Sequence, residues 1–177
     1  DVLADFSKQR ITTAVVDELI AAAKDAGVFA LRDRMITGDA INATEGRAVT
    51  HVAMRAASDT TAPAWLRSAA QDSLHQMRKL VDATPSTITH VVNLGIGGSD
   101  LGPALVCDAL AATRPPVREV RFASNIDPLD LDRAIAGLDP QRTLFVVCSK
   151  SFGTQETLAN ARRAAAWLAA GRVADPR

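Results

Sequence analysis

Residues 88–105 read ITHVVNLGIGGSDLGPAL, and this stretch decides the fold. It opens with an apolar run over residues 88–95 that is typical of a buried strand, followed by a glycine-rich turn. Helical periodicity then extends over residues 100–113. The stretch therefore predicts a strand, a tight turn and a helix in immediate succession.

The alternation of strand and helix continues downstream. Apolar runs at 117–124 and 142–149 predict two more strands, and residues 127–138 and 154–171 predict the helices that follow them. Strands joined by helices lie parallel, because each crossover returns the chain in the same direction. We therefore expect a three-layer α/β/α fold with a parallel sheet and helices on its faces.

The part of the chain before the sheet is predicted to be helical. The periodicity favours three helices, at residues 7–27, 44–57 and 64–83. Residues 30–43 have a turn-like composition instead. Asn42 and Glu45 have the spacing of a capping box, which would start the middle helix.

These patterns suggest two regions. We expect residues 1–87 to form N-terminal helices that pack on the sheet, and residues 88–177 to form the first part of an α/β domain. The chain opens with Asp1 instead of Met and stops just after a predicted helix. We therefore expect it to be a fragment of a longer protein.

The composition excludes several classes of partner. The chain has 20 Lys plus Arg against 20 Asp plus Glu, so no net field would collect nucleic acid or an anionic membrane. No apolar run is long enough to span a bilayer. Cys107 and Cys148 lie in apolar surroundings without metal-ligand spacing, which favours buried thiols in a reducing compartment. We expect a cytoplasmic protein that binds no metal.

The glycine-rich turn resembles a dinucleotide fingerprint but does not match it. The fingerprint needs glycine at its first, third and sixth positions, and counting from Gly95 gives Gly95, Gly97 and then Asp100. Asp127, just after the second predicted strand, has the position of an acid that binds ribose. Nicotinamide binding therefore remains a minor alternative.

An anion explains more of these residues. In GIGGSD, the glycines let backbone amides approach a ligand, and Ser99 adds a hydroxyl at the start of a helix. In CSKSFGTQET, Ser149, Ser151 and Thr154 precede another helix. Because ligands of parallel sheets bind beyond the carboxyl ends of the strands, these two loops predict a cradle for one phosphate monoester.

Each residue also has a simpler interpretation. Ser99 and Thr154 are ordinary N-cap residues when taken singly. Lys150 is equally well explained as a counter-charge for phosphate or as a solvated lysine. Cys148 lies in a strand, which favours an inert core thiol over a nucleophile.

Together, the motifs VVNLGIGGSDLGP, FASNID and TLFVVCSKSFGTQETLANA are similar to the N-terminal sugar-isomerase region of the glucose-6-phosphate isomerase family. The upstream block LRDRMITGDAINATEGRAVTHVAMR resembles that family too, so the resemblance spans nearly the whole chain. It implies the SIS-type, flavodoxin-like form of the α/β/α fold.

The resemblance also implies a function. The family interconverts glucose 6-phosphate and fructose 6-phosphate through a cis-enediol intermediate, as a homodimer and without metal or cofactor. Carried over by motif, the substrate and phosphate site comprises Gly98, Ser99, Ser149, Lys150, Ser151, Phe152, Gly153 and Thr154, and Gln155 and Glu156 match the pattern after it. The family often has threonine where Ser151 and Gly153 stand; the first change keeps the hydroxyl and the second removes one.

The family's proton-transfer residues are a glutamate base, a histidine from the neighbouring subunit, a lysine and an arginine. The resemblance places all of them beyond Arg177, so we expect no catalytic residue in this chain and no turnover by it alone. A noncatalytic sugar-phosphate sensor with the same domain type is the alternative. Such sensors usually carry a DNA-binding helix-turn-helix, and residues 1–87 contain no basic recognition helix.

Overall fold

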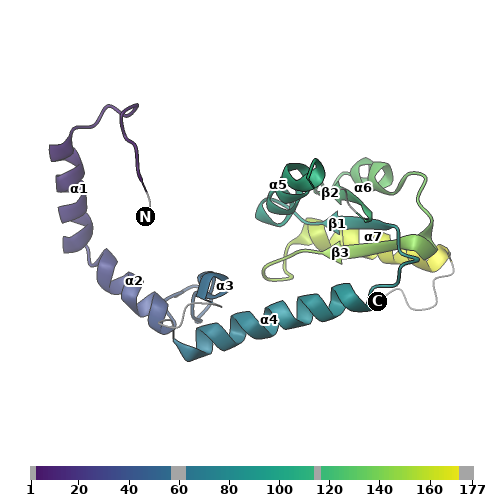
Figure 1. The fold of residues 1–177 in the computed structure, drawn as a ribbon, viewed down its shortest axis with the longest axis horizontal. Coiled ribbons are helices and arrows are strands. Elements are labelled where there is room, and N and C mark those ends of the chain that lie inside the picture. The colour runs from purple at the N-terminus through teal and green to yellow at the C-terminus, as the bar shows by residue number, and fades with distance from the viewer. Residues whose placement is uncertain (1–2, 57–62, 114–116, 172–177) are drawn as a thin grey trace. The chain divides into compact units, whose positions relative to one another are not determined.

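The structure is a computed structural model that describes residues 3–56, 63–113 and 117–171. The chain divides into two compact units, Asp1–Asp82 and Ala83–Arg177, which are described separately below (Figure 1). Among the described residues, none of the helices combines the length and the apolar character needed to cross a membrane.

The second unit is built on a parallel sheet of three strands. These are β1 (His90–Leu94), β2 (Glu119–Ala123) and β3 (Thr143–Val147), in the order β2-β1-β3. Leu94 at the end of β1 lies opposite Ala123 on one side and Val147 on the other. The predicted strands and their parallel direction are confirmed.

Helices lie on both faces of this sheet. They are α5 (Gly98–Ala111), α6 (Pro128–Ile135) and α7 (Gln155–Ala170), and a short 3-10 helix at Pro140–Arg142 precedes β3. Side chains alternate along β1, so Val92 and Leu94 point to the face covered by α6 and α7, and Asn93 points to the face where α5 starts. The three-layer α/β/α prediction is confirmed.

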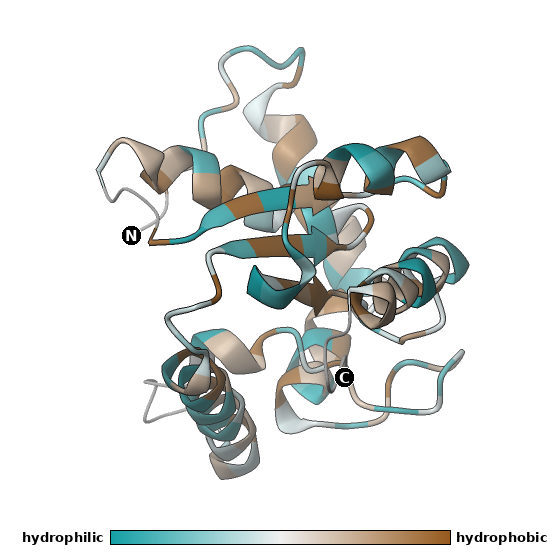
Figure 2. Cartoon of the chain, turned by 90° about the vertical axis from the view of Figure 1, so that its right-hand side faces the viewer, coloured by the Kyte–Doolittle hydropathy of each residue, from teal (hydrophilic) through white to brown (hydrophobic). Residues whose placement is uncertain are grey.

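The core of this unit lies between the sheet and the face formed by α6 and α7. It consists of buried residues from four elements: Val92, Leu94, Ala123, Leu131, Ala134 and Ala164. Hydrophobic residues, brown in Figure 2, run along the strands that this core covers. Phe145 on β3 extends the core through an edge-to-face contact with Trp167 on α7, with ring centroids 5.9 Å apart.

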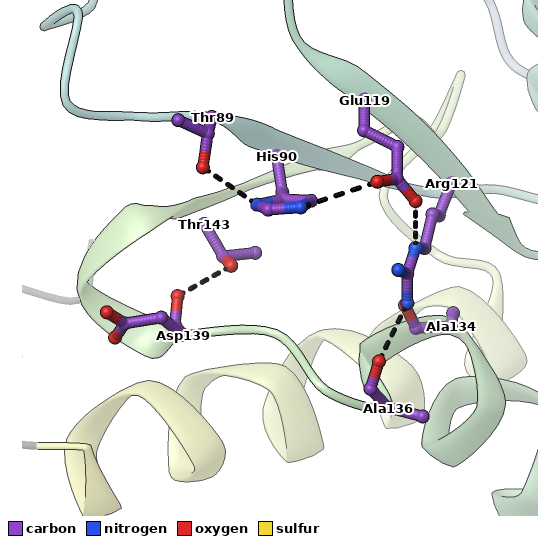
Figure 3. A network of polar contacts seen from close by, with 8 residues as sticks. All are labelled: Thr89, His90, Glu119, Arg121, Ala134, Ala136, Asp139 and Thr143. Carbon is purple, nitrogen blue, oxygen red and sulfur yellow. Dashed lines mark hydrogen bonds and ion pairs between the residues drawn. The ribbon is translucent and has the colours of Figure 1, made fainter.

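A polar network closes the amino-terminal edge of the sheet (Figure 3). The Arg121 Nε donates to Glu119 Oε1 at 2.7 Å, and the His90 Nε2 lies 3.4 Å from Glu119 Oε2. The other side of the same guanidinium donates to the carbonyls of Ala134 and Ala136 at the end of α6. Arg121 therefore ties the last turn of α6 to β2.

We expect the contribution of Glu119 to stability to disappear in acid. The hydrogen bond with Arg121 lowers the pKa of Glu119 below its ordinary value of 4.5. A lowered folded-state pKa means that the ionised carboxylate stabilises the fold above that value, and that the gain is lost as the pH falls through the folded pKa. The free energy of unfolding of Glu119→Gln should therefore be lower than that of the wild type at pH 7 and approach it near pH 3.

Urea unfolding at each pH measures this difference, which should also shrink at high salt because Glu119 is exposed. A difference that stays constant between pH 7 and pH 3 would contradict the prediction.

The first unit contains four helices in its described part: α1 (Thr13–Asp25), α2 (Val28–Thr37), α3 (Ala53–Ala56) and α4 (Ala64–Ala83). The prediction for α4 is confirmed, and the Pro63 carbonyl accepts the amides of its first turn. The helix predicted from Ser7 begins later, at Thr13, because the Thr12 hydroxyl caps the Val15 amide at 3.3 Å.

The prediction of a turn over residues 30–43 is wrong for residues 30–37, whereas residues 38–43 lie outside the helices as predicted. Residues up to Thr37 belong to α2, which starts after Gly27 and ends at Gly38. Gly38 and Asp39 follow Thr37 and end this helix, since glycine is the common residue just past a helix C-terminus. The Trp65 Nε1 donates to the Thr37 carbonyl at 3.2 Å and so joins α2 to α4.

The helix predicted over residues 44–57 is also wrong for residues 44–52, whereas α3 covers residues 53–56 and residue 57 lies outside the described residues. The predicted side-chain contacts do form: the Glu45 amide donates to Asn42 Oδ1 at 3.3 Å, and the Asn42 Nδ2 donates to Glu45 Oε2 at 3.1 Å. They close a turn, because Asn42 and Arg47 form an antiparallel bridge. Local side-chain bonds of this kind compete with helix formation.

Candidate functional site

The order of the strands places the two predicted loops at a switch point of the sheet. β1 and β3 are neighbours, but β1 continues into α5 on one face and β3 continues into α7 on the other. In open parallel sheets, ligands bind beyond the carboxyl ends of the strands at such a switch point. The Cys148 amide donates to the Leu94 carbonyl at 2.8 Å, which keeps the starts of both loops adjacent.

The first loop depends on two glycines. Gly97 has φ +58° and ψ −122°, a conformation that side chains strongly disfavour. At Gly95, a Cβ atom would lie 2.5 Å from the Ser99 carbonyl oxygen, so only glycine permits this approach of β1 to α5. Gly98 and Ser99 form the first turn of α5, in which the Asp100 and Leu101 amides already donate to the Gly97 carbonyl at 3.0 and 2.8 Å.

The Ser99 amide already donates to the Ile96 carbonyl at 3.2 Å, so the hydroxyl is the donor that Ser99 has left for a ligand. The interpretation of Ser99 as an N-cap is wrong, since Gly97 occupies that position without a side-chain bond. Asp100 follows Ser99 in the same turn, and its buried Oδ1 has no hydrogen-bond partner among the described residues. A negatively charged carboxylate in this turn counteracts anion binding.

The second loop folds around its own serines. The Phe152 amide donates to the Ser149 hydroxyl at 3.0 Å, and the Gly153 amide donates to the Ser151 hydroxyl at 3.3 Å. Each hydroxyl accepts in these bonds and keeps its own hydrogen for a ligand. The amides of Phe152 and Gly153 are thus used within the loop, and the hydroxyls are the groups it presents.

This loop exposes the consecutive residues Lys150, Ser151 and Phe152. Phe152 has φ +50°, which is strained for a residue with a side chain. Lys150 forms no ion pair with the described residues, so its ammonium is available as a counter-charge. Thr154 is the N-cap residue of α7, as predicted, although its hydroxyl makes no capping hydrogen bond.

The loop after β2 has different chemistry. The Asp130 Oδ2 accepts the amides of Ser124 at 2.8 Å and Asn125 at 2.9 Å, so a carboxylate already satisfies the donors of this loop. Asp127 accepts the Leu129 amide at 2.9 Å and thereby caps α6. The residue that the nicotinamide alternative requires therefore has a structural role, and this loop offers an anion no free donors at these positions.

The sequence analysis missed two buried amides that support the loops. Asn93 on β1 contacts the Ser99 carbonyl and Cys148, and Asn160 on α7 donates to the Asn125 carbonyl at 2.8 Å. The sequence feature that could have identified them is a polar residue inside an apolar strand or on the buried face of a helix. Burial raises the pKa of the Cys148 thiol, which favours the protonated, unreactive form.

The two loops can bind an anion but offer little for proton transfer. They combine neutral hydroxyls, helix N-terminal amides and one lysine, and none of these is a general base of ordinary strength near pH 7. Within the described ranges, no three His, Cys, Asp or Glu side chains gather to hold a metal ion. The arrangement suits the binding and orientation of a phosphate group.

Comparisons with known proteins agree with this geometry. The family model described as phosphoglucose isomerase matches residues 5–176. The glucose-6-phosphate isomerase of Cupriavidus taiwanensis is 44% identical over 97% of this chain and 34% of its own length. That of Burkholderia pseudomallei is 44% identical over 94% of this chain and 32% of its own length.

A solved structure gives the same result. The crystal structure of a glucose-6-phosphate isomerase from Chlamydia trachomatis superposes with a TM-score of 0.69 at 27% identity, over 87% of this chain and 32% of that one. The chain thus spans about a third of the length of the curated relatives it matches.

Proposed function

The chain belongs to the phosphoglucose isomerase family, and on this premise we propose that it binds the phosphate group of glucose 6-phosphate and fructose 6-phosphate. The observation that carries the proposal is the convergence of two hydroxyl-bearing loops at the β1/β3 switch point. We propose Gly98, Ser99, Ser149, Lys150, Ser151, Phe152, Gly153 and Thr154 as the binding residues. Ser99, Ser149, Ser151 and Thr154 would donate hydroxyl hydrogens, and Lys150 would supply charge.

The proposed reaction of the whole protein is aldose–ketose isomerisation through a cis-enediol, without cofactor. A phosphate held at these loops lies remote from C1 and C2 of the sugar, so its binding energy orients the reacting carbons. The general base must come from elsewhere in the protein, because the loop groups do not accept protons near pH 7. We further propose that the whole protein is a cytoplasmic homodimer. In each subunit, the N-terminal helices would pack on the sheet.

A binding and turnover assay of the full-length protein tests this function. Calorimetry should show saturable binding of glucose 6-phosphate, with glucose bound at least about a hundredfold more weakly because it lacks the charge-assisted phosphate contacts. A coupled assay should detect glucose 6-phosphate formed from fructose 6-phosphate.

NADH serves as the control ligand, because the nicotinamide alternative predicts the opposite preference. Equal affinity for glucose and glucose 6-phosphate, or tight binding of NADH alone, would contradict the proposal. Binding without turnover would favour the noncatalytic sensor.

A further inference from the structure

A buried amide links the two loops of the proposed site. Asn93 is only 5% exposed and lies in the central strand between Val92 and Leu94, which are both fully buried. Placing a primary amide in such a position costs free energy unless both of its ends are hydrogen-bonded. We infer that Asn93 is a positioning residue that sets the spacing between the two phosphate-binding loops, an inference that rests on the proposed function.

The two ends of the Asn93 amide reach different loops. The Nδ2 donates to the Ser99 carbonyl at 3.0 Å, and the Oδ1 accepts from the Cys148 Sγ at 3.1 Å. The orientation of the amide follows from chemistry, because a carbonyl oxygen can only accept a hydrogen bond. One side chain thus joins the first turn of α5 to the residue that immediately precedes Ser149.

The bond to Ser99 replaces one that its helix cannot make. In an α-helix, the carbonyl of residue 99 would accept the amide of residue 103. That residue is Pro103, which has no N–H and whose ring crowds the same carbonyl. The Asn93 amide supplies the missing donor and so holds the turn that carries the Ser99 hydroxyl.

The bond to Cys148 acts on the second loop. The backbone of Cys148 is fixed to β1 through the Leu94 carbonyl, and its side chain is fixed through Asn93. Burial raises the pKa of the thiol, so it stays in the protonated form that donates. Both anchors lie one residue before Ser149, and the direction in which the second loop leaves the sheet therefore depends on them.

A neutral amide suits this position. Asparagine provides a donor and an acceptor without charge, whereas an aspartate of the same shape would lack the donor for Ser99 and add a negative charge beside a phosphate. The site already contains the carboxylate of Asp100 in the same turn of α5. A second one would weaken anion binding further.

The test compares variants of the full-length protein by calorimetric titration with glucose 6-phosphate and with inorganic phosphate. Asn93→Leu, which keeps the approximate volume but removes both bonds, should weaken both ligands roughly tenfold. Val92→Ala is the matched control, because it removes buried volume from the opposite face of the same strand. It should lower the melting temperature and leave both affinities within about twofold of the wild type.

Two substitutions of Cys148 disturb the structure less and test the positioning role if Asn93→Leu does not fold. Cys148→Ala removes the donor and should weaken glucose 6-phosphate binding about threefold, whereas Cys148→Ser keeps a donor and should restore it. Pro103→Ala should reduce the effect of Asn93→Leu, because the helix then supplies its own donor to Ser99. If Asn93 served stability alone, these variants would change the free energy of unfolding and bind glucose 6-phosphate with the affinity of the wild type.

The outcomes separate the inference from the function on which it rests. If the wild type binds glucose 6-phosphate and Asn93→Leu binds it equally well, the positioning role is overturned and the proposed function stands. If the wild type binds neither ligand, the proposed function fails and the inference falls with it. Weakened binding by Asn93→Leu and Cys148→Ala, with recovery in Cys148→Ser, is the expected result.

Discussion

Replacing Ser149 and Ser151 together by alanine is expected to raise the Michaelis constant of the full-length protein for glucose 6-phosphate at least about a hundredfold. Each hydroxyl would donate to a charged phosphate oxygen, and a hydrogen bond to a charged group contributes about 1.5–3 kcal/mol. Two such bonds correspond to a factor of roughly 100 or more. The turnover number should fall less, because the phosphate is bound in both the ground state and the transition state.

The same hydroxyls also shape their loop. Ser149 accepts the Phe152 amide and Ser151 accepts the Gly153 amide, so alanine removes two internal bonds of a loop that contains a strained residue. The Ser151→Thr variant keeps a hydroxyl at that position and is the matched control, with a Michaelis constant near that of the wild type. Steady-state kinetics measure both variants, and a nearly normal Michaelis constant for the double alanine variant would refute the phosphate-binding loop.

The elements of the sheet were predictable from sequence because their pattern is strong and local. The apolar run before Gly95 is a strand buried on both faces, and helical periodicity begins within a few residues of it. The order of the strands is a different matter. Helix-linked parallel strands occur in more than one order, including 2-1-3, and periodicity does not distinguish these orders.

The strand order decides which loops form the site. All three loops follow the carboxyl end of a strand, and from sequence alone the hydroxyl residues favoured the loops after the first and third strands. The order β2-β1-β3 selects the pair that flanks the switch point, and Asp130 satisfies the amides of the remaining loop. That Asp130 folds back onto Ser124 depends on the local path of the chain between β2 and α6, which no spacing rule encodes.

The helix wrongly predicted over residues 44–57 of the first unit has a local explanation. Around Asn42, the side chain bonds to the Glu45 amide as it would at a helix start, and the chain turns back instead of continuing as a helix. The same short-range contact serves both structures, so the pattern alone does not choose between them. In the second unit, long-range strand pairing removes this ambiguity.

The close approach of β1 to α5 leads to the second large effect, at Gly95. Gly95→Ala would place a Cβ atom 2.5 Å from the Ser99 carbonyl oxygen, a backbone atom that cannot move without the first turn of α5. We expect the free energy of unfolding to fall by about 1–3 kcal/mol, the usual cost of overpacking. Because Ser99 moves with that turn, the affinity for glucose 6-phosphate should fall as well.

Gly102, which lies within α5, provides the matched control. A Cβ atom there meets nothing within 4 Å, and alanine is favoured over glycine in a helix interior. Gly102→Ala should therefore raise the free energy of unfolding by about 0.5–1 kcal/mol and leave the affinity unchanged. Urea unfolding and calorimetric titration of the two variants measure both quantities. Opposite signs of the stability change would show that Gly95 is required for the contact with Ser99, whereas equal changes would mean that β1 and α5 do not approach as closely as the structure indicates.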